Sequence, residues 1–226
     1  MSAAPPEPSV SLLVVDDEEL TRAGLRTLLS AKPGLTVVGE AADGVDALAL
    51  AERLRPDVVL MDVRMPRMDG IEATRRIREE VPDPPKIVII TTFENDEYVW
   101  DALVAGASGF IRKRAPSTQI ADAIRFVASG DSVLFPAEVR QLAVSRRPIV
   151  PRASRGSVAL TGRERQILGL MAEGLSNQQI SRRLTVSLET VKTHVGNVLA
   201  KLDANNRTHA VVLAYEAGAL TPGIGE

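Results

Sequence analysis

The sequence of 226 residues contains no cysteine, which excludes disulfide bonds, thiolate metal sites and cysteine nucleophiles. Aromatic residues make up only 3% of the chain, with a single tryptophan. No apolar run approaches the roughly 20 residues that a membrane-spanning helix needs. Residues 1–8 are rich in alanine and proline and lack the basic and apolar regions of a signal peptide, which predicts a short disordered tail. Together these absences predict a globular, cytoplasmic protein that does not contact a membrane.

Charge is unevenly spread along the chain, although the net charge is only −2. Residues 1–145 contain 16 Lys and Arg against 23 Asp and Glu, a net charge of −7. Residues 146–226 contain 11 against 6, a net charge of +5. An acidic half joined to a basic half indicates two different tasks, and the basic half is the candidate for contact with nucleic acid.

The acidic half alternates between short apolar runs and segments with helical spacing. This alternation predicts an α/β domain over residues 9–130, with a parallel sheet in the flavodoxin-like strand order 2-1-3-4-5 and helices on both faces. The predicted strands cover residues 9–15, 35–41, 58–62, 86–91 and 109–112. Asp43 is a predicted N-cap of the second helix, on whose inward face we expect Val45, Leu48, Ala49 and Leu54.

The remainder of the chain has no strand pattern. Residues 131–156 predict one short helix and an exposed linker. Residues 157–220 predict a small all-α domain of four helices, two of which begin with capping boxes at Thr161 and Ser176. The second and third of these helices are joined by a three-residue turn, which is typical of a helix-turn-helix.

Polar residues follow four of the predicted strands, at the edge of the sheet where open α/β proteins bind ligands. Three carboxylates brought close together repel each other unless a cation joins them, and oxygen ligands suit Mg²⁺, with Mn²⁺ as an alternative ion. With a hydroxyl and a lysine beside them, one carboxylate can accept a phosphoryl group. We expect that acceptor to be Asp62, in a pocket completed by Asp16, Asp17, Thr91 and Lys113.

The motifs around these residues carry a resemblance to a known family. Residues 12–17 (LLVVDD), 61–70 (MDVRMPRMDG), 89–92 (IITT) and 106–113 (GASGFIRK) resemble the receiver domain of two-component response regulators. The resemblance implies that a sensor histidine kinase phosphorylates Asp62. It also implies that Mg²⁺ is bound by Asp16, Asp17, Asp62 and the backbone carbonyl of Arg64, that Thr91 and Phe110 form a conformational switch, and that Lys113 contacts the phosphoryl group.

The predicted helix-turn-helix offers polar side chains to a DNA major groove, because the apolar residues of its second helix face inward. We expect contacts to bases or phosphates from Ser176, Asn177, Thr190, Lys192, Thr193, Asn197, Lys201 and Arg207. Residues 160–164 (LTGRE), 172–177 (AEGLSN) and 190–195 (TVKTHV) resemble the LuxR-type DNA-binding domain. With the receiver, the whole chain is similar to the NarL/FixJ class of response regulators, which implies a homodimer on phosphorylation, double-stranded DNA as ligand and RNA polymerase as a further partner.

Other interpretations of the same residues stay open at this point. Asp16 and Asp17 could instead cap a helix, and Lys113 could be a solvated surface lysine. A Mg²⁺-dependent phosphatase could use Asp62 as its nucleophile, but Arg64 stands where such chemistry needs an acid. The chain is therefore expected not to be an enzyme beyond its own phosphotransfer and autodephosphorylation. The remaining alternative is a constitutive DNA-binding regulator whose receiver only mediates dimerisation.

Overall fold

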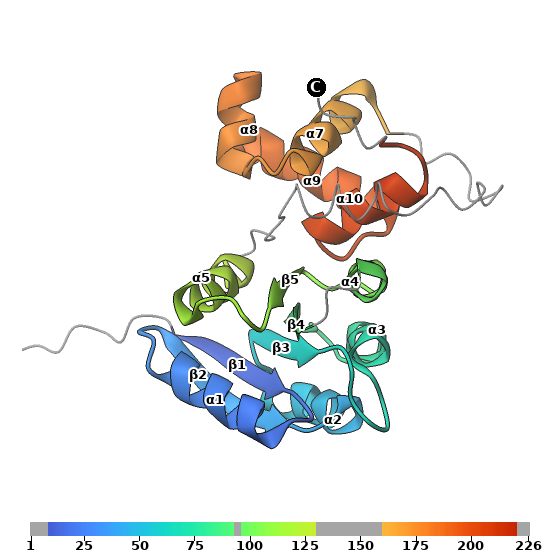
Figure 1. Ribbon diagram of the computed structural model, residues 1–226. Helices are drawn as coiled ribbons and strands as arrows, with labels where there is room; N and C mark the ends of the chain where they lie inside the picture. The colour runs from blue at the N-terminus through green and yellow to red at the C-terminus, as the bar shows by residue number, and fades with distance from the viewer. Residues whose placement is uncertain (1–8, 93–95, 130–159, 221–226) are drawn as a thin grey trace, which may run out of the picture. The chain divides into compact units, whose positions relative to one another are not determined.

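The computed structural model describes residues 9–92, 96–129 and 160–220 (Figure 1). The chain divides into two compact units, residues 1–130 and 131–226. The predicted tail at residues 1–8 and the predicted helix and linker at 131–156 lie outside the described residues.

The first unit is built on a five-stranded parallel sheet with the strand order β2-β1-β3-β4-β5, which confirms the prediction. Every residue of the central strand β3 is buried, because β-branched and aliphatic side chains leave it on both faces. The strands are β1 (Val10–Val15), β2 (Leu35–Ala41), β3 (Val58–Asp62), β4 (Lys86–Thr91) and β5 (Gly109–Arg112).

Five helices cover the two faces of this sheet, as crossovers between parallel strands require (Figure 1). Helix α1 packs against α5, while α2 packs against α3 and α3 against α4. The helices are α1 (Glu19–Ser30), α2 (Gly44–Leu54), α3 (Gly70–Glu80), α4 (Asp96–Val104) and α5 (Ser117–Ala128).

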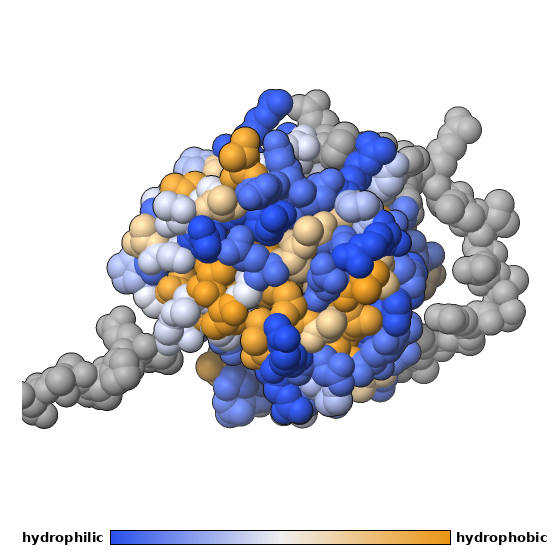
Figure 2. All heavy atoms as spheres, turned by 90° about the horizontal axis from the view of Figure 1, so that it is seen from below, coloured by the Kyte–Doolittle hydropathy of each residue, from blue (hydrophilic) through white to orange (hydrophobic). Residues whose placement is uncertain are grey.

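Helix α2 begins as predicted but buries a partly different face. The Asp43 side chain accepts a hydrogen bond from the Val45 backbone N–H at 2.8 Å, which confirms it as the N-cap. The predicted inward face is confirmed only in part. Leu48 and Leu54 are half-buried, but Ala49 is exposed and Val45 is 41% exposed, while α2 buries the small residues Gly44, Ala47 and Ala51. These small residues let α2 lie directly against the chain that follows β3. Figure 2 shows that apolar side chains lie among hydrophilic ones on one face of the molecule.

The described secondary structure of the second unit consists of helices joined by turns. Both predicted capping boxes are present, between Thr161 and Glu164 and between Ser176 and Gln179. Thr185 takes a left-handed conformation, with φ of 52°, in the turn between α8 and α9. No described helix of either unit is long and apolar enough to span a membrane. The helices are α7 (Gly162–Ala172), α8 (Asn177–Leu184), α9 (Leu188–Leu202) and α10 (Arg207–Glu216).

An ion pair joins the first turn of α7 to the last turn of α9. The carboxylate of Glu164 is 4% exposed and lies 2.7 Å from the Lys201 ammonium. The hydrogen bond from Lys201, together with one from the Thr161 backbone N–H, lowers the pKa of Glu164 to about 2. Both bonds favour the ionised carboxylate, so this contact ties two segments that lie 37 residues apart in the sequence.

We predict that Gly70→Ala strongly destabilises the first unit, because a Cβ at this position would lie 1.9 Å from the Asp62 carbonyl oxygen. Backbone cannot move aside as a flexible side chain can, so the cost should reach about 3 kcal/mol, the upper part of the range for overpacking. Urea denaturation measures it. The control is Gly24→Ala on α1, where a Cβ meets nothing within 4 Å and should add roughly 0.5–1 kcal/mol of stability. Equal effects of the two substitutions would contradict the described geometry.

We also predict that Glu164→Gln lowers the melting temperature of the helical unit near neutral pH. An acid with a lowered pKa stabilises the fold above its ordinary pKa of 4.5, and this contribution is lost as the pH falls towards about 2. The difference between wild type and variant in calorimetry should therefore shrink across that interval. Glu173→Gln, at the exposed C-terminal end of the same helix, is the control. A difference that does not depend on pH would speak against the ion pair.

Candidate functional site

Three carboxylates meet at the carboxyl edge of the sheet. Asp62 is the last residue of β3, and Asp16 and Asp17 follow the end of β1, the neighbouring strand. Carboxylate oxygens from the three residues all lie within 4.8 Å of one another. Asp16 and Asp62 are buried while Asp17 is exposed, so the cluster has a wall inside the protein and one side open to solvent.

Lys113 supplies the positive charge of this pocket. Its ammonium lies 2.6 Å from Asp16 Oδ2 and 3.2 Å from Asp62 Oδ2. The Lys113 side chain is only 12% exposed, which excludes the interpretation of a solvated surface lysine. Burial alone would lower the pKa of this ammonium, but its contacts with Asp16 and Asp62 outweigh burial and raise it. Lys113 is therefore charged throughout the physiological range.

The pKa of Asp62 is raised to about 6. The largest cause is burial, which disfavours the charged form, and the nearby Asp16 carboxylate adds to it. Lys113 acts in the opposite direction but does not restore the ordinary value. Burial and the Asp16 carboxylate together disfavour the ionised Asp62 more than Lys113 favours it, and a further cation would favour the ionised form.

The donor set fits a hard divalent cation. Three carboxylates give oxygen ligands only, and the exposed side at Asp17 leaves room for the waters that Mg²⁺ retains. Among the acidic, histidine and cysteine side chains of the described residues, these three carboxylates lie close enough to share one metal ion.

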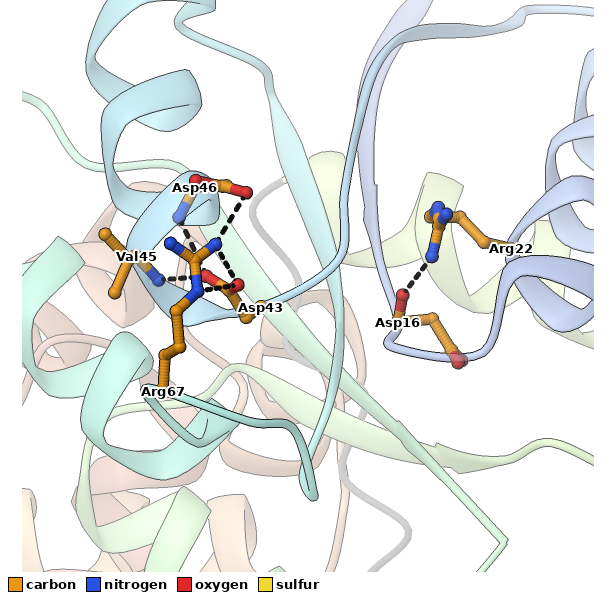
Figure 3. Close-up of polar contacts among 6 residues, drawn as sticks. All are labelled: Asp16, Arg22, Asp43, Val45, Asp46 and Arg67. Atoms are coloured by element: carbon orange, nitrogen blue, oxygen red, sulfur yellow. Dashed lines mark hydrogen bonds and ion pairs between the residues drawn. The ribbon is translucent and has the colours of Figure 1, made fainter.

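The acidic pair after β1 does not serve as the N-cap of α1. That position is taken by Glu18, whose side chain makes no capping hydrogen bond. Asp16 does accept a hydrogen bond from the Glu18 backbone N–H at 3.0 Å, through Oδ1. Arg22 on α1 donates to the backbone carbonyl of Asp16 at 2.6 Å (Figure 3). Asp16 Oδ1 thus faces the backbone at the start of α1, while Oδ2 faces Lys113 in the pocket.

The two residues expected to form a switch lie on adjacent strands. Thr91 ends β4 and is 2% exposed; Phe110 lies in β5 and is 9% exposed. The Thr91 carbonyl accepts the backbone N–H of Lys113 at 2.9 Å, which links the hydroxyl-bearing strand end to the lysine. Across the pocket, the guanidinium of Arg64 lies 5.8 Å from the centre of the Tyr98 ring on α4, within the range of a cation–π contact.

The helical unit presents polar side chains on one side of α9. Val191, Val195 and Val198 are buried, so the apolar stripe faces inward as expected. The residues of this helix that are predicted to contact DNA are all exposed: Thr190, Lys192, Thr193, Asn197 and Lys201.

Four of the predicted DNA contacts also hold the helical unit together: Ser176, Asn177, Lys201 and Arg207. Lys201 binds the buried Glu164, as described above. Arg207, at the start of α10, donates to the Asn177 side-chain oxygen at 3.3 Å and to the Leu175 carbonyl. Ser176 caps α8. Their roles towards DNA stay predictions, as do the roles of all the other site residues.

Sequence reasoning missed the arginines that surround the acidic pocket without entering it. Arg22 binds the Asp16 backbone, and Arg67 binds Asp43 and Asp46 of the helix α2 region (Figure 3). No pattern in the sequence pairs Arg67 with residues 24 and 21 positions earlier, because the pairing depends on how two loops meet.

Both units match known families. Residues 12–125 match the response regulator receiver domain, and residues 158–214 match the bacterial regulatory proteins of the luxR family. The chain is 42% identical over 206 residues to the transcriptional regulatory protein LiaR of Bacillus subtilis (strain 168), which covers 91% of this chain and 97% of LiaR. It is 40% identical over 208 residues to the response regulator protein VraR of Staphylococcus aureus (strain NCTC 8325 / PS 47), which covers 92% and 97% of the two chains.

Solved structures show the same architecture. The crystal structure of the response regulator ChrA from a heme-sensing two-component system covers 95% of this chain and 100% of its own, with 34% identity and a TM-score of 0.52. An RcsB–DNA complex, with 22% identity and a TM-score of 0.54, covers 92% of this chain and 98% of its own and shares the fold. The chain belongs to the two-component response regulators that join a receiver domain to a LuxR-type DNA-binding domain.

Proposed function

We propose that this protein is a transcription regulator controlled by phosphorylation of Asp62 by a partner sensor histidine kinase. The observation that carries the proposal is the convergence of Asp16, Asp17, Asp62 and Lys113 at one sheet edge. Family membership makes a sensor kinase and DNA the expected partners. The same proposal places the protein in the bacterial cytoplasm, where both partners are accessible.

The chemistry of the pocket suits phosphoryl transfer. A carboxylate oxygen of Asp62 attacks the phosphorus of phosphohistidine, the new O–P bond forms, and the P–N bond to the imidazole breaks. Lys113, 3.2 Å from Asp62, is placed to neutralise charge on the transferred group. A bound Mg²⁺ would neutralise further phosphoryl charge and favour the ionised, nucleophilic form of Asp62. Asp16, Asp17 and Asp62 would hold this ion, with the Arg64 carbonyl as a fourth ligand; Mn²⁺ would fit the same oxygens.

Phosphorylation changes the balance between two conformations of the receiver. The Thr91 hydroxyl would bind the phosphoryl group, and the space this leaves would let the Phe110 ring turn inward. This biases a two-state packing equilibrium and favours a homodimer. The dimer would present two copies of α9 to half-sites one turn of DNA apart, about 34 Å. RNA polymerase is a further partner of the DNA-bound form.

The alternative function is a constitutive DNA-binding regulator whose receiver only mediates dimerisation. It predicts the same helical unit, but it gives no role to the cluster of Asp16, Asp17 and Asp62 beside Lys113 at the sheet edge. That cluster is what favours the phosphorylation-controlled protein.

The test is phosphorylation in vitro. Acetyl phosphate with Mg²⁺ should add one phosphoryl group to the wild type, visible by intact-mass spectrometry, and none to Asp62→Asn. The phosphorylated protein should bind promoter DNA more tightly than the unphosphorylated one in a mobility-shift assay. Absence of labelling with unchanged DNA binding would favour the constitutive regulator, and steady release of inorganic phosphate with no stable adduct would favour a phosphatase.

We further predict a change in the emission of Trp100 when beryllofluoride and Mg²⁺ are added. Trp100 is the only tryptophan, is 3% exposed and lies on α4, the helix that follows the Thr91 strand. Movement of that region on activation alters the surroundings of the indole. An Asp62→Asn control should keep its spectrum, and a wild-type spectrum that also stays constant would mean that α4 does not respond.

A further inference from the structure

We propose that Arg67 is a positioning residue for the metal pocket: its ion pair with Asp43 fixes the loop between β3 and α3, and with it the Arg64 backbone carbonyl. This inference rests on the proposed function, because it concerns the same metal ion. It adds to that function a residue that lies outside the acidic cluster and sets how well the cluster binds its cation.

Arg67 lies in the middle of the loop, residues 63–69, and its side chain reaches back to α2 (Figure 3). The guanidinium donates through Nε and Nη2 to Asp43 Oδ2, and through Nη2 to Asp46 Oδ2 at 2.9 Å. Arg67 has a φ of 61°, a left-handed conformation that costs free energy for any residue with a Cβ. The loop keeps this conformation because the ion pair compensates for it.

The acceptor of this contact is fixed on its own side. The Asp43 side chain is 3% exposed; its Oδ1 accepts the backbone N–H groups of Val45 and Asp46, which leaves Oδ2 for Arg67. Burial acts to raise the pKa of Asp43, but these hydrogen bonds and the Arg67 charge outweigh it and lower the pKa. Arg67 therefore binds a carboxylate that stays ionised and cannot move away.

The same region is joined to the metal pocket through backbone contacts. The Asp16 N–H donates to the carbonyl of Ala41, two residues before Asp43, at 3.1 Å. From Asp43 the Arg67 contact crosses to the loop that begins at Asp62. Asp16 is thus linked to the segment that carries Arg64 by two non-covalent contacts, its hydrogen bond to Ala41 and the Arg67–Asp43 ion pair, which the chain from Ala41 to Asp43 joins.

Backbone hydrogen bonds anchor the loop on both sides of the stretch that carries Arg64 and Arg67. The Gly44 N–H donates to the Met68 carbonyl at 3.0 Å, and a Cβ on Gly44 would lie 2.8 Å from that oxygen. At the far end the Gly70 N–H donates to the Val63 carbonyl at 2.8 Å. Residues 64–67 lie between these two anchors, and the Met68 N–H also donates to the Pro66 carbonyl at 2.6 Å. Within this stretch, the Arg67 side chain is the contact that ties the loop to Asp43 and Asp46.

Charge and position predict opposite effects of removing Arg67, which makes the proposal testable. Loss of a cation near an acidic cluster should by itself strengthen binding of a divalent metal ion. Loss of a positioning contact should weaken it, because the loop carbonyl is no longer held where the ion needs it. Weaker binding in an Arg67 variant therefore cannot come from charge.

The experiment is a titration of the full-length protein with Mn²⁺, with free Mn²⁺ measured by electron paramagnetic resonance. Arg67→Gly should raise the dissociation constant about tenfold, the lower end of what the loss of an outer contact costs. Its melting temperature should stay near that of the wild type, because glycine accepts a positive φ without strain. Arg67→Lys should restore part of the affinity, since lysine keeps the charge but not the forked geometry.

The matched control is Arg75→Gln on α3, which removes an exposed arginine paired with Glu72 on its own helix. It should bind Mn²⁺ as the wild type does or slightly more tightly. Asp43→Asn, which keeps an N-cap acceptor, should add little in the Arg67→Gly background, because the two residues form one contact. Wild-type affinity in Arg67→Gly would overturn the inference and leave the proposed function intact. A wild type that binds no Mn²⁺, and so matches Asp62→Asn, would overturn both.

Discussion

Repulsion among the carboxylates of Asp16, Asp17 and Asp62 is the constraint on which the first unit depends. Their oxygens lie within 4.8 Å, two of the three are buried, and Lys113 is the cation that contacts two of them. The fold holds this arrangement because β1 and β3, which carry it, are adjacent in the sheet and β3 is buried in every residue. Burial and the nearby Asp16 carboxylate raise the pKa of Asp62 despite the contact with Lys113. A divalent cation among these oxygens would favour the ionised form of Asp62.

Two arginines contact the chain next to the pocket without binding the carboxylates of the cluster. Arg22 fixes the Asp16 carbonyl from α1, and Arg67 fixes the loop after Asp62 from the side of α2. This division keeps the centre free for a metal ion and one lysine. It also means that substitutions several residues away from the acidic cluster are expected to change metal affinity while every ligand remains in place.

Some cations of the helical unit hold its helices together, and others lie on its exposed surface. Lys201 is bound to the buried Glu164, whereas Lys192 lies on the exposed side of α9 and pairs only with Glu189, at 2.8 Å. Since an exposed pair of this kind is weak, Lys192 is readily available to DNA. The same domain therefore separates residues that hold its helices together from residues that can read a groove, although both are basic and both lie on one helix.

The sequence by itself determined the strand order, the two capping boxes, the Asp43 N-cap and the identity of the pocket residues. Local patterns carry this information, because periodicity, caps and strand ends depend on neighbours in the chain. Only the tertiary structure decided that α2 buries Gly44, Ala47 and Ala51, that Lys201 binds Glu164, and that Arg67 reaches Asp43. These contacts join segments tens of residues apart. Their partners are chosen by how helices and loops pack, and no local pattern in the chain encodes that.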